Sequence, residues 1–155
     1  MKLYLVRHGE ALSKDVDAER GLSDSGRRDV ECVASNLEKG GVFISQVLHS
    51  GKKRARQTAE ILASRIAKNI DVLAAEGLNP NDPVEHHVYE ARGYRQDTML
   101  VGHLPYMDLL ASRLVAGNED MVSFNFRAGA VLCLERDTNG KWSVAWMLNP
   151  EICNG

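Results

Sequence analysis

Two short segments of this chain, residues 3–6 and 98–101, run without alternation between polar and apolar side chains. A strand with one face in water would alternate, so these runs predict strands that are buried on both faces. Strands of this kind occur almost only in parallel sheets that helices cover on both sides. The rest of the chain must therefore supply helices for two faces of one sheet.

Segments with helical spacing alternate with further strand candidates. Ser23 is predicted to cap a helix whose apolar stripe ends at Gly40-Gly41. Asn139-Gly140, between two apolar runs, predicts a hairpin. We predict two further strands and three further helices, the strands at residues 46–49 and 70–73 and the helices at residues 51–67, 83–92 and 105–117.

The order of these elements predicts an α/β fold. We expect a three-layer sandwich: a mostly parallel central sheet, helices on both faces, and an antiparallel C-terminal hairpin at one edge. The 155 residues suit one domain, and no repeat, low-complexity tract or linker divides them. We therefore predict a single domain over residues 1–155.

Composition excludes several functional classes. The formal net charge of −2 gives no basic field for nucleic acid. Three widely spaced cysteines predict neither a disulfide framework nor a zinc site. The first apolar run ends at Arg7, which is too early for a signal peptide or a membrane span. We expect a cytoplasmic protein without membrane association.

Polar groups follow three of the predicted strands. Arg7-His8-Gly9-Glu10 follows the first strand, residues 50–56 follow the second, and Gly102-His103 follows the fourth. In open α/β sheets, ligands bind beyond the carboxyl ends of the strands. The sequence therefore predicts that these remote segments meet in one crevice.

Four cations, at positions 52, 53, 54 and 56, crowd the start of the predicted helix 51–67. The helix dipole is positive at that end, so the arrangement is unfavourable unless an anion binds there. Arg54 would offer a planar fork for two phosphate oxygens. For the lysines, a solvated basic surface is the simpler interpretation.

His8 and His103, together with Arg7 and Arg54, would make a site of two imidazoles and two guanidiniums. Such a site suits phosphate, whereas its positive charges would repel a metal ion. Neutral imidazole can attack phosphorus and form phosphohistidine. The arginines would neutralise the phosphoryl oxygens in the transition state. Gly9 would let the backbone approach the substrate closely.

The sequence resembles the histidine phosphatase superfamily, relatives of cofactor-dependent phosphoglycerate mutase. The resemblance lies in four segments that span most of the chain in family order: residues 5–10 (LVRHGE), 22–26 (LSDSG), 50–59 (SGKKRARQTA) and 101–103 (VGH). It implies that His8 is the nucleophile and that Arg7, Arg54 and His103 complete the phosphate pocket. Arg20 is a further candidate ligand, and no metal or other cofactor is implied.

The segment for the general acid departs from the pattern of mutases and broad phosphatases of the family. Residues 76–82 contain glutamate but no tryptophan and are short. Glu76 is the candidate proton donor and Asp82 the second candidate, although both also suit exposed loop carboxylates. The compact pattern is most similar to SixA-like phosphohistidine phosphatases.

Three functions follow as hypotheses. The first is a metal-independent phosphatase that removes phosphate from phosphohistidine in a protein partner, for example a histidine-containing phosphotransfer domain. The second keeps the chemistry but takes small phosphomonoesters or sugar phosphates. The third is a phosphate-binding module without turnover. A mutase is disfavoured, because moving phosphate between hydroxyls needs an enclosed site.

Overall fold

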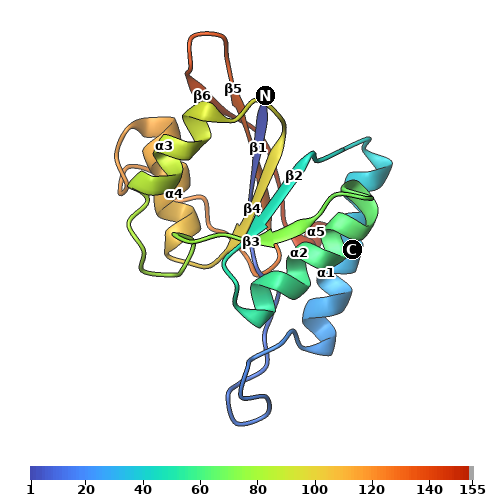
Figure 1. Ribbon diagram of the computed structural model, residues 1–155. Coiled ribbons are helices and arrows are strands. Elements are labelled where there is room, and N and C mark those ends of the chain that lie inside the picture. Colours follow the sequence, from blue (N-terminus) through green and yellow to red (C-terminus); the bar gives the residue numbers. More distant parts are fainter. Residues whose placement is uncertain (154–155) are drawn as a thin grey trace.

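The computed structural model of the protein describes residues 1–153, and these form six strands and five helices (Figure 1). In chain order they are β1 (Lys2–Arg7), α1 (Asp24–Lys39), β2 (Gln46–His49), α2 (Lys53–Ile66), β3 (Val72–Ala74), α3 (Glu85–Gly93), β4 (Thr98–Gly102), α4 (Tyr106–Ala116), β5 (Val131–Arg136), β6 (Trp142–Leu148) and α5 (Pro150–Cys153).

The six strands form one sheet in the order β3-β2-β4-β1-β5-β6. The first four strands are mutually parallel, and β5 runs antiparallel to both β1 and β6. β1 lies between β4 and β5, with Arg7 paired to Gly102 of β4. The predicted α/β fold with an antiparallel C-terminal hairpin is confirmed.

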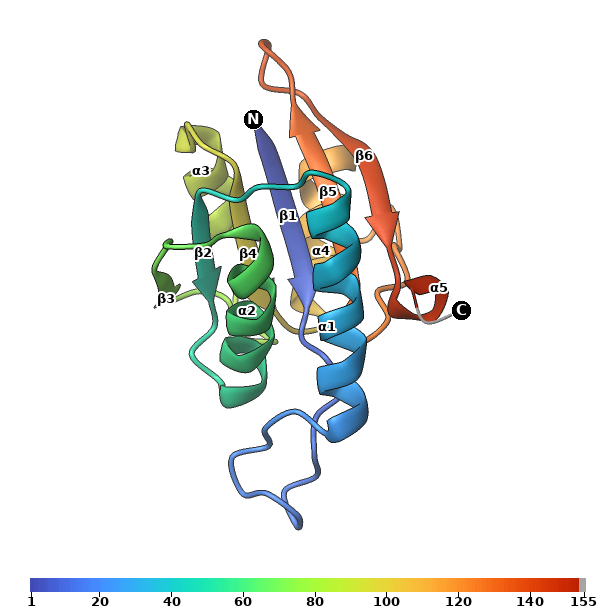
Figure 2. The ribbon, with the colours of Figure 1, turned by 90° about the vertical axis from the view of Figure 1, so that its right-hand side faces the viewer.

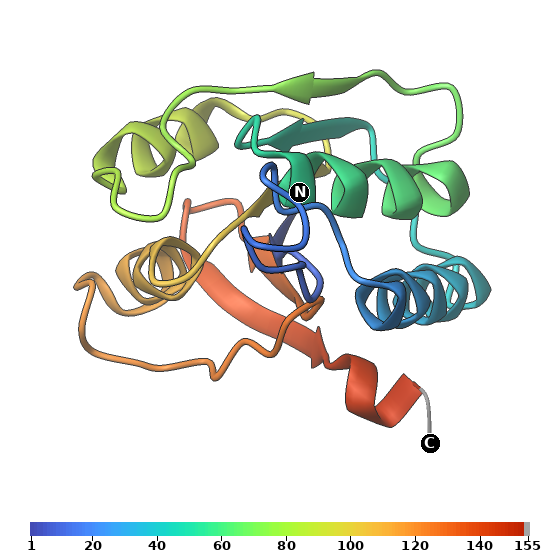
Figure 3. The ribbon, with the colours of Figure 1, turned by 90° about the horizontal axis from the view of Figure 1, so that it is seen from below.

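Helices cover both faces of the sheet (Figures 2 and 3). α1 and α2 lie on one face, where their apolar sides pack against Tyr4 and Val6 of β1. α3 and α4 lie on the other face and pack against Leu3 and Leu5. Successive side chains of a strand point to opposite faces, so a strand between two helical layers must be apolar at every position.

Local signals place the element boundaries. The Ser23 hydroxyl accepts a hydrogen bond from the Gly26 amide at 2.9 Å and caps α1 as predicted. α4 ends at Gly117, whose φ of 84° is costly for other residues. The predicted strand 70–73 is displaced to Val72–Ala74, because the Ile70 amide is engaged by the Ala67 carbonyl in the turn after α2. α5 was not predicted, since four residues are too few to show helical periodicity.

No helix within residues 1–153 has both the length and the apolar character needed to cross a bilayer.

Candidate functional site

Three neighbouring strands end at the same edge of the sheet and carry the predicted site residues there. β2, β4 and β1 are adjacent and parallel, so their carboxyl ends lie side by side. His8 follows β1, His103 follows β4, and Arg54 lies in the first turn of α2 after β2. The imidazole rings of His8 and His103 have centroids 5.0 Å apart. The structure thus brings together segments that are nearly 100 residues apart in sequence.

His8 is held as a neutral imidazole. Its Nδ1 lies 2.6 Å from the Gly9 carbonyl oxygen, which can only accept, so Nδ1 carries the proton in the neutral ring. Nε2 then keeps its lone pair. Burial lowers the pKa of His8 to about 4, and the positive charges of Arg54, Arg7 and Arg20 add to this effect. The imidazole is therefore neutral at physiological pH, and the lone pair of its Nε2 is available.

His103 is almost fully buried, and Ser50 holds one of its nitrogens. The Ser50 Oγ atom lies 2.7 Å from Nε2 of His103. Nδ1 has no hydrogen-bond partner within residues 1–153. Burial lowers the pKa of His103 to about 3, with smaller contributions from the charges of His8 and Arg54. A second neutral imidazole with a free nitrogen thus lies beside the first.

The two arginines differ in how they are held. Arg7 donates from Nη1 to the Phe126 carbonyl at 2.9 Å, which fixes one edge of its guanidinium. Arg54 has a buried Nε that finds no acceptor in the described part of the chain. Burial lowers the pKa of both side chains. An unpartnered guanidinium nitrogen in a half-buried site favours an anionic ligand.

Arg20 has an uncommon backbone conformation. Its φ is 55°, in the left-handed region that residues other than glycine rarely adopt. Its Nε donates to the Leu12 carbonyl at 3.0 Å. Its charge acts on both His8 and Arg54, whose pKa values it helps to lower. The guanidinium of Arg20 therefore lies close enough to His8 and Arg54 to add to the positive charge of the same site.

The loop between β1 and α1, which carries Arg20, is held to α2 by side chains for which sequence analysis predicted no role. Asp17 accepts hydrogen bonds from the Gly21 amide at 2.8 Å and from Lys53 Nζ at 3.1 Å. Gln57 accepts from the Leu22 amide at 2.8 Å. Figure 3 shows this loop over the end of the sheet. These contacts join segments that are distant in the sequence. Aspartate and glutamine are common in loops and helices, so their identity alone does not predict that they hold the loop in place.

Gly9 allows close contact with α1. A Cβ atom at this position would lie 2.8 Å from Cγ2 of Val30, which is closer than such atoms approach. The Gly9 amide donates to Thr58 Oγ1 at 3.0 Å, and the same hydroxyl donates to the Arg54 carbonyl. Thr58 lies in the segment 50–59 that carries the family resemblance, but sequence analysis predicted no role for it. It joins the loop after β1 to the turn that presents Arg54. Substrate binding by Gly9 stays a prediction.

Glu76 and Asp82 line a cavity of about 610 Å³ that also includes Ser50, the partner of His103. Glu76 is exposed, and its carboxylate makes no hydrogen bond or ion pair to any of residues 1–153. Asp82 instead accepts from the Asn79 amide at 2.9 Å and closes a turn. The two candidate acids therefore differ: one oxygen of Asp82 is engaged in a turn, whereas neither oxygen of Glu76 is engaged within residues 1–153, and proton donation by either stays a prediction.

Within residues 1–153, no group of three or more histidine, cysteine, aspartate or glutamate side chains is arranged to hold a metal ion. The donors near His8 are cationic guanidiniums, which suit an anion.

The sequence of the chain is similar to a known protein family and to several curated proteins. The sequence profile of the histidine phosphatase superfamily (branch 1) matches residues 3–79, which include both His8 and Arg54. The mitochondrial serine/threonine-protein phosphatase Pgam5 of Drosophila grimshawi is 32% identical over 104 residues, covering 61% of this chain and 36% of that protein. The chain spans only 35 to 41% of the length of the curated relatives that it matches.

Solved structures extend the similarity over the whole fold. The protein histidine phosphatase SixA, in complex with tungstate, superposes with a TM-score of 0.85 at 25% identity, covering 99% of both chains. The α-ribazole phosphatase from Shigella flexneri superposes with a TM-score of 0.75 at 18% identity over 96% of both chains. The similarity to SixA extends over nearly all of this chain. The similarity to the α-ribazole phosphatase, at 18% identity, concerns the fold alone.

Proposed function

Because this chain belongs to the histidine phosphatase superfamily, we propose that it is a phosphatase that uses His8 as a covalent phosphate acceptor. The single observation that carries the proposal is the state of His8. Its Nδ1 is occupied by the Gly9 carbonyl at 2.6 Å, and its pKa is lowered to about 4, so Nε2 keeps a lone pair for attack.

The reaction has two steps. Nε2 of His8 attacks the phosphorus atom, a P–N bond forms, and the bond to the leaving group breaks with its electron pair going to that group. Water then attacks the phosphorus of phospho-His8, the P–N bond breaks, and inorganic phosphate leaves. Arg7 and Arg54 would neutralise the phosphoryl oxygens in both transition states. The free Nδ1 of His103 supports a further contact to the same oxygens.

We propose phosphohistidine in a protein as the preferred substrate. The likeness to a protein histidine phosphatase over 99% of both chains supports this choice. The chemistry agrees with it, since transfer from a substrate histidine to His8 exchanges one P–N bond for another. Imidazole is also a good leaving group that is readily protonated near neutral pH. Such a substrate places little demand on a general acid.

The alternative is hydrolysis of small phosphomonoesters or sugar phosphates. It rests on Glu76, whose available carboxylate lines the cavity that includes Ser50. An alkoxide leaving group benefits strongly from a positioned acid, typically by about 10²–10⁴ in rate. A phosphate-binding module without turnover is the third hypothesis, and the neutral state of His8 disfavours it.

The test is to trap the intermediate. Acid-labile, base-stable phosphate should accumulate on His8 when turnover is quenched, and His8→Ala should abolish both labelling and phosphate release. The variant should keep its thermal unfolding midpoint, because the side chain lies outside the apolar core. Phosphate on another residue, or activity that survives in His8→Ala, would refute the mechanism. A chelator should leave the rate unchanged, because the proposed mechanism uses no metal, and loss of activity on chelation would contradict it.

A further inference from the structure

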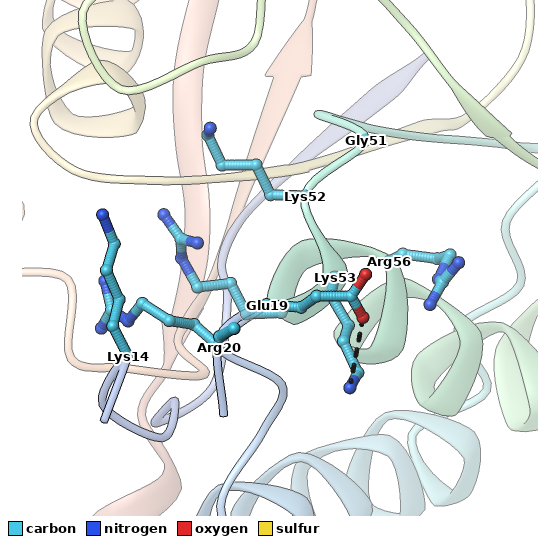
Figure 4. Close-up of a pocket in the computed structure, with 9 residues that line it drawn as sticks. Lys14, Glu19, Arg20, Gly51, Lys52, Lys53 and Arg56 are labelled. Carbon is cyan, nitrogen blue, oxygen red and sulfur yellow. Dashed lines mark ion pairs between the residues drawn. The ribbon is translucent and has the colours of Figure 1, made fainter. Parts of the chain in front are cut away.

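A cavity of about 360 Å³ lies beside the phosphate site, between the loop that carries Arg20 and the start of α2. Its lining has six cationic side chains and one carboxylate, that of Glu19. The chain as a whole carries a formal charge of −2, so this face differs sharply from the rest of the molecule. Figure 4 shows the cavity with Lys14, Arg20 and Lys52 on one side and Lys53 and Arg56 extending to the other.

Two of the six cations are neutralised within the protein. Lys53 Nζ lies 3.1 Å from Asp17 and 3.7 Å from Glu19. Glu19 is the one carboxylate in the cavity lining, and it is therefore paired with Lys53. Arg56 Nε lies 3.6 Å from Glu60 on the same helix. Both side chains are therefore accounted for by intramolecular ion pairs.

The remaining cations carry more positive charge than is needed to neutralise one phosphoryl group. They are Lys14, Arg20, Lys52 and Arg54. A phosphoryl group carries a charge of about −2 at neutral pH. Arg54 and Arg20, together with Arg7 nearby, already supply three positive charges around His8. Lys14 and Lys52 are exposed, and neither has a carboxylate within ion-pair distance among the residues described. The positive charge of Lys52 helps to lower the pKa of His103. Lys52, whose charge is not needed for the phosphoryl group, therefore lies close to the phosphate site.

We propose that Lys14 and Lys52 bind carboxylates that flank the phosphohistidine on the surface of the protein substrate. This inference rests on the proposed function and narrows its substrate class to phosphohistidines in an acidic setting. An acidic protein surface complements this face and is repelled by the net negative charge elsewhere. Charge complementarity of this kind steers encounter and fixes orientation.

The test uses two synthetic phosphohistidine peptides of the same sequence, one with glutamates and one with glutamines on either side of the phosphohistidine. Each peptide is assayed with the wild type, with the double variant Lys14→Gln/Lys52→Gln and with the control Lys39→Gln/Lys141→Gln. The control makes the same charge change at the far end of α1 and in the β5–β6 hairpin, away from the loop that carries Arg20 (Figure 2).

The wild type and the control should prefer the glutamate peptide by roughly three- to tenfold in kcat/KM at low salt, as two exposed ion pairs allow. The double variant should lose most of this preference, and so should the wild type at about 0.5 M salt, where exposed charges are screened. Equal hydrolysis of both peptides by the wild type, or an undiminished preference in the double variant, would refute the inference alone. Hydrolysis of neither peptide, with no phosphate on His8, would refute the proposed function and the inference with it.

Discussion

The hydroxyl of Ser50 lies 2.7 Å from Nε2 of His103 and so connects the ends of two adjacent strands, β2 and β4, at the site. The same oxygen lies 3.4 Å from the amide of Lys52 at the start of α2. One side chain thus fixes the orientation of the second imidazole relative to the turn that presents Arg54.

Ser50→Ala should lower kcat by roughly three- to tenfold, the range for loss of one hydrogen bond that orients a side chain. Ser50→Thr should restore most of the rate, because it keeps the hydroxyl. Ser64→Ala is the matched control, since Ser64 Oγ donates only to the Ile61 carbonyl on the exposed side of α2. The measurement is kcat for phosphate release by the wild type and the three variants. An unchanged kcat in Ser50→Ala would contradict a role of Ser50 in orienting His103.

Arg54→Ala should lower kcat by about 10²–10³, the scale for one donor that acts in the transition state. Arg56 offers a matched control two residues along the same helix, because its Nε is paired with Glu60 at 3.6 Å and extends away from the site. Arg56→Ala should therefore change kcat by less than about threefold. Similar losses in both variants would indicate a diffuse basic surface in place of a specific pocket.

His8 and His103 should titrate far below ordinary histidines. In the folded protein, burial lowers their pKa values to about 4 and about 3, so NMR titration of the free enzyme should show no midpoint near 6.5 for either ring. Below pH 6.5 the unfolded chain binds protons at these positions that the folded protein excludes. The free energy of unfolding should therefore fall as the pH is lowered from about 6.5 toward 4.

The stability measurement needs its own control. The pKa values of His49 and His87 are also lowered by burial, so these histidines contribute in the same direction as His8 and His103. His8→Ala removes the contribution of His8 alone, so the loss of unfolding free energy between pH 6.5 and 4.5 should be smaller than in the wild type. A wild-type His8 midpoint between 6 and 7 would contradict the lowered pKa and with it the expected pH dependence of the unfolding free energy.

Glu76→Gln should reduce hydrolysis of a phosphomonoester more than hydrolysis of a phosphohistidine protein. An alkoxide must be protonated as it leaves, whereas imidazole leaves with less assistance. Comparing kcat/KM for both substrates in wild type and variant measures this difference. Asp82→Asn is the control, since Asp82 closes a turn and accepts from the Asn79 amide. A wild-type preference for a small phosphomonoester that disappears in Glu76→Gln would favour the alternative function.

Much of the fold could be predicted because its signals are local. The uninterrupted apolar character of β1 and β4 reflects burial between two helical layers, and Ser23 and Gly117 mark helix ends through backbone chemistry. The hairpin at Asn139-Gly140 is confirmed, with Gly140 at a φ of 85°. The short edge strand β3 begins two residues later than predicted and ends one residue later, because the turn that precedes it depends on where α2 ends.

The candidate site was predictable only in its outline. His8, Arg54 and His103 follow strands that parallel pairing brings together, so strand order alone indicates their proximity. The contacts that hold the site, such as Asp17 with Lys53 and Ser50 with His103, join residues 36 and 53 positions apart. Side chains of these types are common in surface loops, and only the tertiary structure shows which of them meet.

The central position of β1 has a consequence for dynamics. β1 is paired on both sides, by β4 and by β5, whereas β3 and β6 form the edges of the sheet. Local opening in proteins begins at such edges and at chain ends, and central strands exchange their amide hydrogens only in larger openings. His8, the proposed nucleophile, thus directly follows the segment that should be slowest to exchange with deuterium. Fraying of either edge would leave His8 at its place beside His103, so the protein should keep its reactive geometry through most of its spontaneous fluctuations.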